Sequence, residues 1–195
     1  MKIISASIFF VFILIFGFGL NACDRSDRVE AARETDSRDD RQDMLTEEDK
    51  DFVLYASEMH IGEADLAKLA KQKSMNKDIT DYADAVIGSH ADALKQLSER
   101  MRQKGASLST MGSLDTKYHT EFLSPLSGAE FDRQFIELMI ADHQDAGSTF
   151  RTQLNATANK DLKDCVQHSL PELENRLREA RDLQSKLKAQ GSRTN

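Results

Sequence analysis

The chain of 195 residues has no tryptophan and only two prolines, Pro125 and Pro171. Because proline interrupts helices and strands, its scarcity leaves room for long regular elements. No segment shows the alternating apolar pattern of a strand, and Ala, Leu, Lys, Glu, Asp and Gln dominate. This composition is typical of an all-helical protein.

Basic residues are also fewer than acidic ones, 26 against 33. The net charge is −7 and the sequence pI is near 5.3. No strongly basic patch stands out, so we expect no nucleic-acid partner. The sequence lacks a Gly-x-Ser-x-Gly motif, a glycine-rich phosphate loop and an HExxH motif. These absences remove the common signatures of hydrolases, nucleotide-binding enzymes and zinc proteases, and we expect a non-enzymatic protein.

The long apolar run at the start of the chain is a secretory signal. Met1-Lys2 precedes the uncharged segment IISASIFFVFILIFGFGL, and Leu20-Asn21-Ala22-Cys23 follows. This ending resembles the bacterial lipobox. The resemblance implies a signal peptide over residues 1–22 that is removed, and a Cys23 that carries palmitate-type acyl chains in the bilayer. The alternative is an uncleaved membrane anchor.

Residues 23–44 are predicted to form a disordered tether between Cys23 and the folded domain. The segment is dominated by charged side chains and has no aromatic residue, so it buries too little apolar surface to fold. Similarity to enteric lipoproteins implies that Asp24 favours retention in the inner membrane, facing the periplasm, although the outer membrane remains an alternative. Cys165 is then the one thiol left, and we expect it to be buried.

Residues 45–190 are predicted to form one helical domain, followed by a disordered tail at 191–195. Four long helices begin at good capping residues, namely Thr46, Asn76, Ser127 and Asn159. Ser127 and Glu130 have the spacing of a capping box. A short helix is expected around residues 115–123, in the longer connection between the second and third long helices. Pro171 should kink the last helix or break its hydrogen bonding locally.

The two halves of the domain echo each other. Asn76-Lys77-Asp78-Ile79 recurs as Asn159-Lys160-Asp161-Leu162, and the same offset relates His60 to His143. Two helical hairpins joined by a long crossover have the connectivity of ferritin-like bundles. We therefore predict an all-α, ferritin-like antiparallel four-helix bundle with a short helix in its crossover.

Polar residues interrupt the apolar stripes near the middle of three of these helices. Glu63 and His90 occupy stripe positions, and Asp142 and His143 lie in or beside the stripe of the third long helix. Carboxylate and imidazole groups from facing helices are how bundles hold Zn, Cu or Ni. Such a cluster also exists as a hydrogen-bonded structural feature without any ion, and the sequence leaves both interpretations open.

A ferritin-type di-iron centre is excluded by spacing, because it needs Glu-x-x-His on two helices. The positions three residues before His60, His90, His143 and His168 hold Ser57, Ile87, Ile140 and Cys165. None is glutamate, so only a mononuclear site with two histidines and one carboxylate remains as a metal hypothesis.

The domain resembles a bacterial family of exported, ferritin-like proteins of unknown function, often labelled "predicted outer membrane protein". The matching segments are FVLYASEMHIGEADLAKLA, AVIGSHADALKQL, SGAEFDRQFIELMIADHQDA and SLPELENRLREA. The resemblance implies histidines at His90 and His143, and a third after the Leu-Pro step, where this chain has Arg176. That arginine could pair with Glu63 or Asp142 and keep them ionised.

These observations predict a lipid-anchored protein of the bacterial envelope with a helical bundle in the periplasm. The first expectation is a non-enzymatic role in binding an envelope protein or in stress tolerance. The alternative is a transition-metal-binding module that uses Glu63, His90 and His143, with Asp142 orienting a histidine or adding an oxygen ligand.

Overall fold

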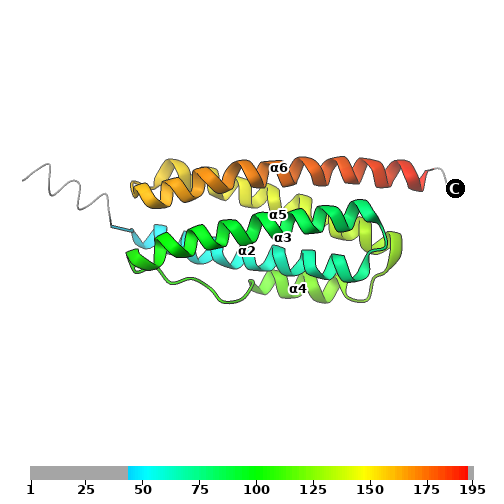
Figure 1. Ribbon diagram of the computed structural model, residues 1–195, viewed down its shortest axis with the longest axis horizontal. Helices are drawn as coiled ribbons and strands as arrows, with labels where there is room; N and C mark the ends of the chain where they lie inside the picture. Colours follow the sequence, from blue (N-terminus) through cyan, green and yellow to red (C-terminus); the bar gives the residue numbers. More distant parts are fainter. Residues whose placement is uncertain (1–43, 193–195) are drawn as a thin grey trace, which may run out of the picture. The chain divides into compact units, whose positions relative to one another are not determined.

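The computed structural model describes residues 44–192, which fold as helices without a strand. Figure 1 labels them in chain order. They are α2 (Glu47–Lys73), α3 (Lys77–Met101), the 3₁₀ turn η1 (Arg102–Lys104), α4 (Leu114–Leu123), α5 (Gly128–Ala156) and α6 (Lys160–Gly191). The all-helical prediction is confirmed. The predicted signal peptide, Cys23, nearly all of the tether and residues 193–195 lie outside the described residues. None of the described helices is long and apolar enough to cross a membrane.

All four long helices begin where their capping residues predict, and three of these residues make a side-chain capping bond. Thr46 and Asp49 form a reciprocal capping box, with Asp49 N–H donating to Thr46 Oγ1 at 3.1 Å. Asn76 accepts from the N–H of Asp78, and Asn159 accepts from that of Leu162, each at 3.0 Å. These bonds satisfy amide groups that have no partner inside the first helical turn.

The predicted capping box at the start of α5 is wrong. Ser127 is the N-cap residue, but its side chain makes no capping hydrogen bond. Gly128 has a positive φ of 58°, a backbone conformation that residues other than glycine rarely adopt. Glu130, the expected partner, pairs with Arg133 one turn further along the helix instead. Pro171 was predicted to kink or interrupt the last helix. In the structure, α6 continues through Pro171 as one helix.

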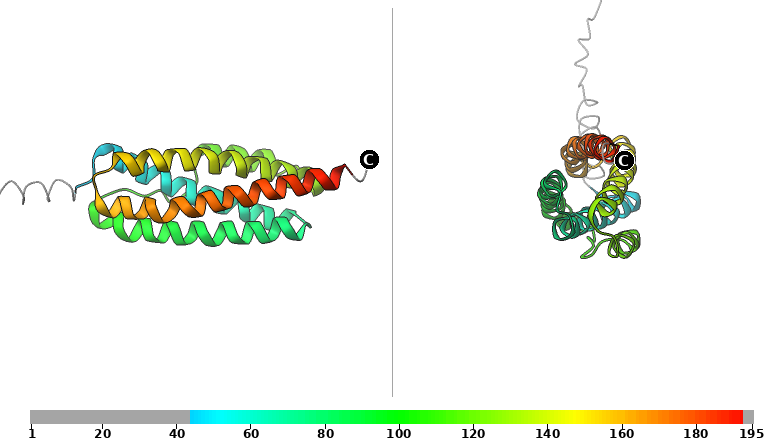
Figure 2. Two further views of the ribbon diagram at one scale, coloured as in Figure 1. Left: turned by 90° about the horizontal axis from the view of Figure 1, so that it is seen from above. Right: turned by 90° about the vertical axis from the view of Figure 1, so that its right-hand side faces the viewer.

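The four long helices pack side by side (Figures 1 and 2). α2 packs on α3, and α5 packs on α6, so residues close in sequence form two helical pairs. Contacts of α3 with α6 and of α2 with α5 join the pairs, and the short α4 lies against α2 and α5. This arrangement leaves one interior lined by all four long helices.

The interior contains two apolar clusters. One is built around Leu66, Val86, Phe135, Met139 and Ala180. The other is built around Ala56, Leu97, Ala146, Phe150 and Leu173. On every long helix, polar residues fall between the two clusters in sequence: His60 and Glu63 on α2, His90 on α3, His143 on α5 and Arg176 on α6. We refer to these five residues as the polar layer.

Candidate metal-binding site

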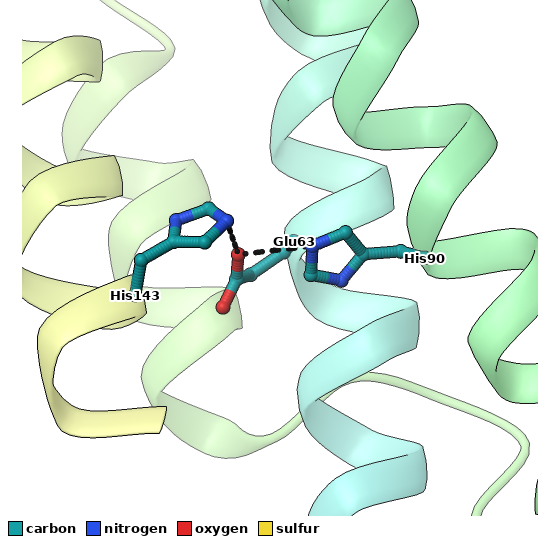
Figure 3. A group of neighbouring side chains, drawn as sticks. All are labelled: Glu63, His90 and His143. Atoms are coloured by element: carbon teal, nitrogen blue, oxygen red, sulfur yellow. Dashed lines mark ion pairs between the residues drawn. The ribbon is translucent and has the colours of Figure 1, made fainter. Parts of the chain in front are cut away.

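Glu63, His90 and His143 come together in the interior from three different helices. Figure 3 shows the carboxylate of Glu63 between the two imidazole rings. Glu63 Oε2 lies 3.1 Å from His143 Nε2 and 3.5 Å from His90 Nε2. All three side chains are at most 4% exposed. The prediction that these residues meet inside the bundle is confirmed.

The protonation of His143 follows from its second nitrogen. His143 Nδ1 lies 2.7 Å from the backbone oxygen of Met139, one helical turn away. Because a carbonyl oxygen only accepts, Nδ1 carries a hydrogen and donates it. Burial lowers the pKa of His143 to about 4, so the ring is neutral near pH 7. Its Nε2 atom therefore presents a lone pair to Glu63.

His90 contacts another buried histidine, His60, which was not among the predicted ligands. His60 Nδ1 lies 3.2 Å from His90 Nδ1, and the rings meet edge to face. Burial lowers the pKa of His60 to about 3 and lowers that of His90 well below its ordinary value. When His90 Nδ1–H donates to His60, His90 Nε2 also presents a lone pair to Glu63. Histidine ligands are commonly oriented by such a bond to the other ring nitrogen.

Glu63 is the least satisfied member of the group. Neither of its carboxyl oxygens, nor His143 Nε2, makes a hydrogen bond with another protein group. The 3.1 Å approach of Glu63 to His143 is within ion-pair distance but lacks hydrogen-bond geometry. Burial raises the pKa of Glu63 well above its usual range, with Asp142 contributing in the same direction. A proton or a cation would satisfy the lone pairs that converge here.

Asp142 does not join this group. It lies beside His143 in sequence, but its Oδ2 faces His119 Nδ1 of α4 at 3.6 Å. Neighbouring residues on a helix point about 100° apart, so only one of the two can face the interior. His119 is partly buried at this contact. Burial raises the pKa of Asp142, and His119 partly opposes that shift.

Arg176 does not pair with Glu63 or Asp142 as the sequence suggested. Its guanidinium contacts two glutamates of its own helix, Glu179 at 2.6 Å and Glu172 at 3.6 Å. Its side chain is mostly buried, and its charge contributes to lowering the pKa values of His90 and His143. Burial is therefore the main reason that both histidines are neutral, and Arg176 adds to its effect. Burial shifts the pKa of Glu63 in the opposite direction, upward.

The ligand atoms suit a single small transition-metal ion. One atom from each of the three residues lies within 4.8 Å of the others, and no other such group occurs among residues 44–192. Ligands about 2.0–2.2 Å from a tetrahedral ion are about 3.4 Å apart, close to both Glu63–histidine distances. Two imidazoles and one carboxylate match the preferences of Zn, Cu and Ni. Three protein ligands leave one coordination position for water or another molecule.

Residues 34–183 match a protein family described as "Domain of unknown function (DUF4142)". The chain belongs to this family. The expectation of membership in a family of unknown function is thereby confirmed. Membership in DUF4142 assigns no activity, so the chemistry of this chain must be argued from its own residues. No curated protein matches the chain.

A solved structure supports the helical fold of this DUF4142 protein. The chain is similar to a DUF305 fragment from Deinococcus radiodurans, with a TM-score of 0.66 and 18% sequence identity. The match covers 73% of this chain and 99% of the fragment. At this identity the likeness concerns the arrangement of helices alone.

Proposed function

We propose that this protein binds one divalent transition-metal ion through Glu63, His90 and His143. The observation that carries the proposal is the buried carboxylate of Glu63, which has no hydrogen-bonding partner and faces two imidazole nitrogens. The role is one of binding rather than catalysis. Zn²⁺, Cu²⁺ and Ni²⁺ are the ions whose ligand preferences suit this set.

A purely structural cluster accounts less well for these contacts. Buried polar groups in proteins nearly always have hydrogen-bond partners, and each one without a partner costs about 1–3 kcal/mol. Here Glu63 Oε2 and His143 Nε2 both lack partners and face one another. Their convergence favours a ligand that satisfies several at once, which is what a cation does.

The proposed location of the protein is the bacterial envelope. The lipobox-like sequence before Cys23 supports a lipid anchor in the bilayer, and Asp24 favours the inner membrane with the domain facing the periplasm. The long connection that carries α4 between two helical pairs supports ferritin-like, antiparallel connectivity for the domain.

Metal titration of the purified protein tests this proposal. Native mass spectrometry with Zn²⁺, Cu²⁺ or Ni²⁺ should show one bound ion per chain. With free ion at 100 times the dissociation constant, stabilisation of about 2.7 kcal/mol should raise the melting temperature by about 5–10 °C. Glu63→Gln should lose both effects.

Glu137→Gln, which changes an exposed glutamate on α5, provides a matched control and should behave like the wild type. If the wild type binds no ion stoichiometrically, or if Glu63→Gln binds as well as the wild type, the proposed site is wrong.

Binding of an envelope protein is a second candidate, supported by the outer face of α4. Leu114, Tyr118 and Phe122 follow one another at intervals of four residues and are 85%, 68% and 42% exposed. Side chains at this spacing share one helix face. An apolar stripe on a helix is a common recognition surface.

A photo-reactive amino acid at position 118, introduced in living cells, tests this candidate. It should crosslink to one envelope protein, whereas the same group at the exposed Ser185 of α6 should not. Equal crosslinking from both positions would argue against a specific partner on α4.

A further inference from the structure

A cavity of about 200 Å³ opens beside the proposed metal site, between α2, α4 and α5. Its lining includes Glu58 and Glu63 of α2, Asp115 and His119 of α4, and Asp142 and Asp145 of α5. We call this cavity the vestibule. One of its lining residues, Glu63, is therefore shared with the buried group of ligands.

The charges around the vestibule are of one sign. Five carboxyl groups line it together with one imidazole, and no lysine or arginine is among its lining residues. Glu63, whose side chain is only 4% exposed, is its innermost acid, and Oε1 of Glu63 lacks any hydrogen-bond partner. Figure 3 shows this second oxygen pointing away from both imidazole rings. An acidic cleft that ends in a buried, unpartnered carboxyl group favours a cation over any other ligand.

The walls of the vestibule are held by close packing. A β-carbon at Gly62 would lie 2.1 Å from Thr116 Oγ1, and one at Gly112 would lie 2.9 Å from the Cα of Gly62. Glycine at both positions lets the start of α4 approach α2 directly. On the opposite wall, Asp142 and His119 connect α5 to α4. The opening is therefore bounded by side chains with defined contacts.

We propose that the vestibule is the path by which a hydrated divalent cation reaches Glu63, and that its carboxylates form an outer site for this cation. This inference rests on the proposed function of the buried site. A volume of about 200 Å³ holds about six waters at ~30 Å³ each, which is the first hydration shell of such an ion. Outer carboxylates replace part of that shell as oxygen ligands. The ion then loses its remaining waters to Glu63, His90 and His143.

Stopped-flow absorbance with Co²⁺ as the probe measures this step, because the visible spectrum of Co²⁺ changes on entering a low-coordinate site. The informative variant is Glu58→Gln with Asp145→Asn, which neutralises two acids of the vestibule and leaves the Asp142–His119 contact intact. Its association rate constant at low ionic strength should fall by at least about fivefold, because clefts of one charge accelerate the association of opposite charges. The wild-type rate should fall with added salt more steeply than that of the variant.

The control is Asp161→Asn with Asp164→Asn, an equal change of net charge on α6, which contributes no residue to the vestibule. Its rate should stay within about twofold of the wild type. If the vestibule variant and this control have the same rate, the entry path is wrong although the buried site stands. If the wild type itself gives no stoichiometric Co²⁺ spectrum, the buried site and its entry path both fail. Asp142→Asn provides a second test should the double variant not fold, and it should also slow association.

Discussion

At the scale of single residues, the interior is unusual for the number of ionisable groups it keeps neutral. His60, His90 and His143 are all at most 3% exposed, and burial is the largest cause of their lowered pKa values. Glu63 is buried with them and is shifted in the opposite direction. In each case burial disfavours the charged form of the side chain. The stability of the fold must therefore depend on pH.

The free energy of unfolding should fall as the pH is lowered from 7 to 5. The pKa of His60 is 6.5 in the unfolded chain and about 3 in the folded one, so between these values the unfolded chain binds more protons. Acid then favours unfolding by about 1.4 kcal/mol per pH unit for each such histidine. Glu63 acts in the opposite sense above pH 4.5, because its folded form retains a proton. Because acid lowers stability through three histidines and raises it through one glutamate, the net effect of acid is a loss of stability.

Urea unfolding between pH 7 and pH 5 measures this dependence. His60→Asn removes one titrating group and keeps an acceptor near His90, so its stability should fall with acid by about 1 kcal/mol per pH unit less than that of the wild type. Ser185→Asn, at an exposed position on α6 without a titrating group, should retain the wild-type slope. An unchanged slope in His60→Asn would show that this histidine is not kept neutral by burial.

Periodicity was sufficient to predict that Glu63, His90 and His143 meet inside the bundle, but it did not separate Asp142 from them. Glu63 and His90 stand at stripe positions, and His143 is one turn from the buried Met139, so helix geometry alone brings them inside. His60 was missed because the apolar stripe that includes Glu63 does not include it, whereas both side chains are buried in the structure. Its relation to His143 by the internal repeat was the one available signal. Asp142 could not be placed, because its contact depends on His119 of α4. The partners of Arg176 lie one turn away on its own helix, and the resemblance pointed instead to Glu63 or Asp142.

At the scale of the helices, capping residues predicted the starts of α2, α3 and α6 because those contacts are local. The start of α5 at Ser127 was also predicted, but its capping box does not form, and the next residue, Gly128, has a positive φ. The position of α4 was beyond prediction. It depends on contact of Gly62 with Gly112 and Thr116, which lie far along the chain from Gly62.

Gly62→Ala should loosen α4 from α2. The new methyl group would lie 2.1 Å from Thr116 Oγ1 and 3.1 Å from Thr116 Cβ, so rotation of one hydroxyl cannot relieve the overlap. We expect a loss of about 1–3 kcal/mol, the usual range for overpacking a close contact. Gly88→Ala is the control, because a β-carbon there meets nothing within 4 Å and alanine favours a helix.

Thermal unfolding of both variants, with amide hydrogen exchange in α4, distinguishes the effects. Gly62→Ala should melt earlier and exchange faster in α4, whereas Gly88→Ala should be at least as stable as the wild type. Slower exchange or wild-type stability in Gly62→Ala would contradict the close packing.

At the scale of the whole described domain, the polar layer divides one core into two. The apolar clusters on either side would be continuous if Glu63, His90 and His143 were apolar. Burying unpartnered polar groups lowers stability, and their replacement by apolar residues of similar volume often raises it by about 1–4 kcal/mol. A bundle selected only for stability would have no reason to keep this layer. Its presence in the middle of the core therefore favours a function located there.

Replacing the three residues together tests that argument. The variant Glu63→Leu, His90→Leu, His143→Leu should raise the free energy of unfolding by about 1–3 kcal/mol in the presence of a chelator, because it joins the two clusters and removes the unpartnered atoms of Glu63 and His143. The gain should exceed the cost of the lost contact between His60 and His90. The same variant should gain nothing from added Zn²⁺, whereas the wild type should gain about 2.7 kcal/mol at 100 times its dissociation constant. Urea unfolding with and without Zn²⁺ measures both quantities on one protein. A triple variant less stable than the wild type under chelation would mean that the polar layer stabilises the fold by itself, and the case for a metal ion would then depend on the binding measurements alone.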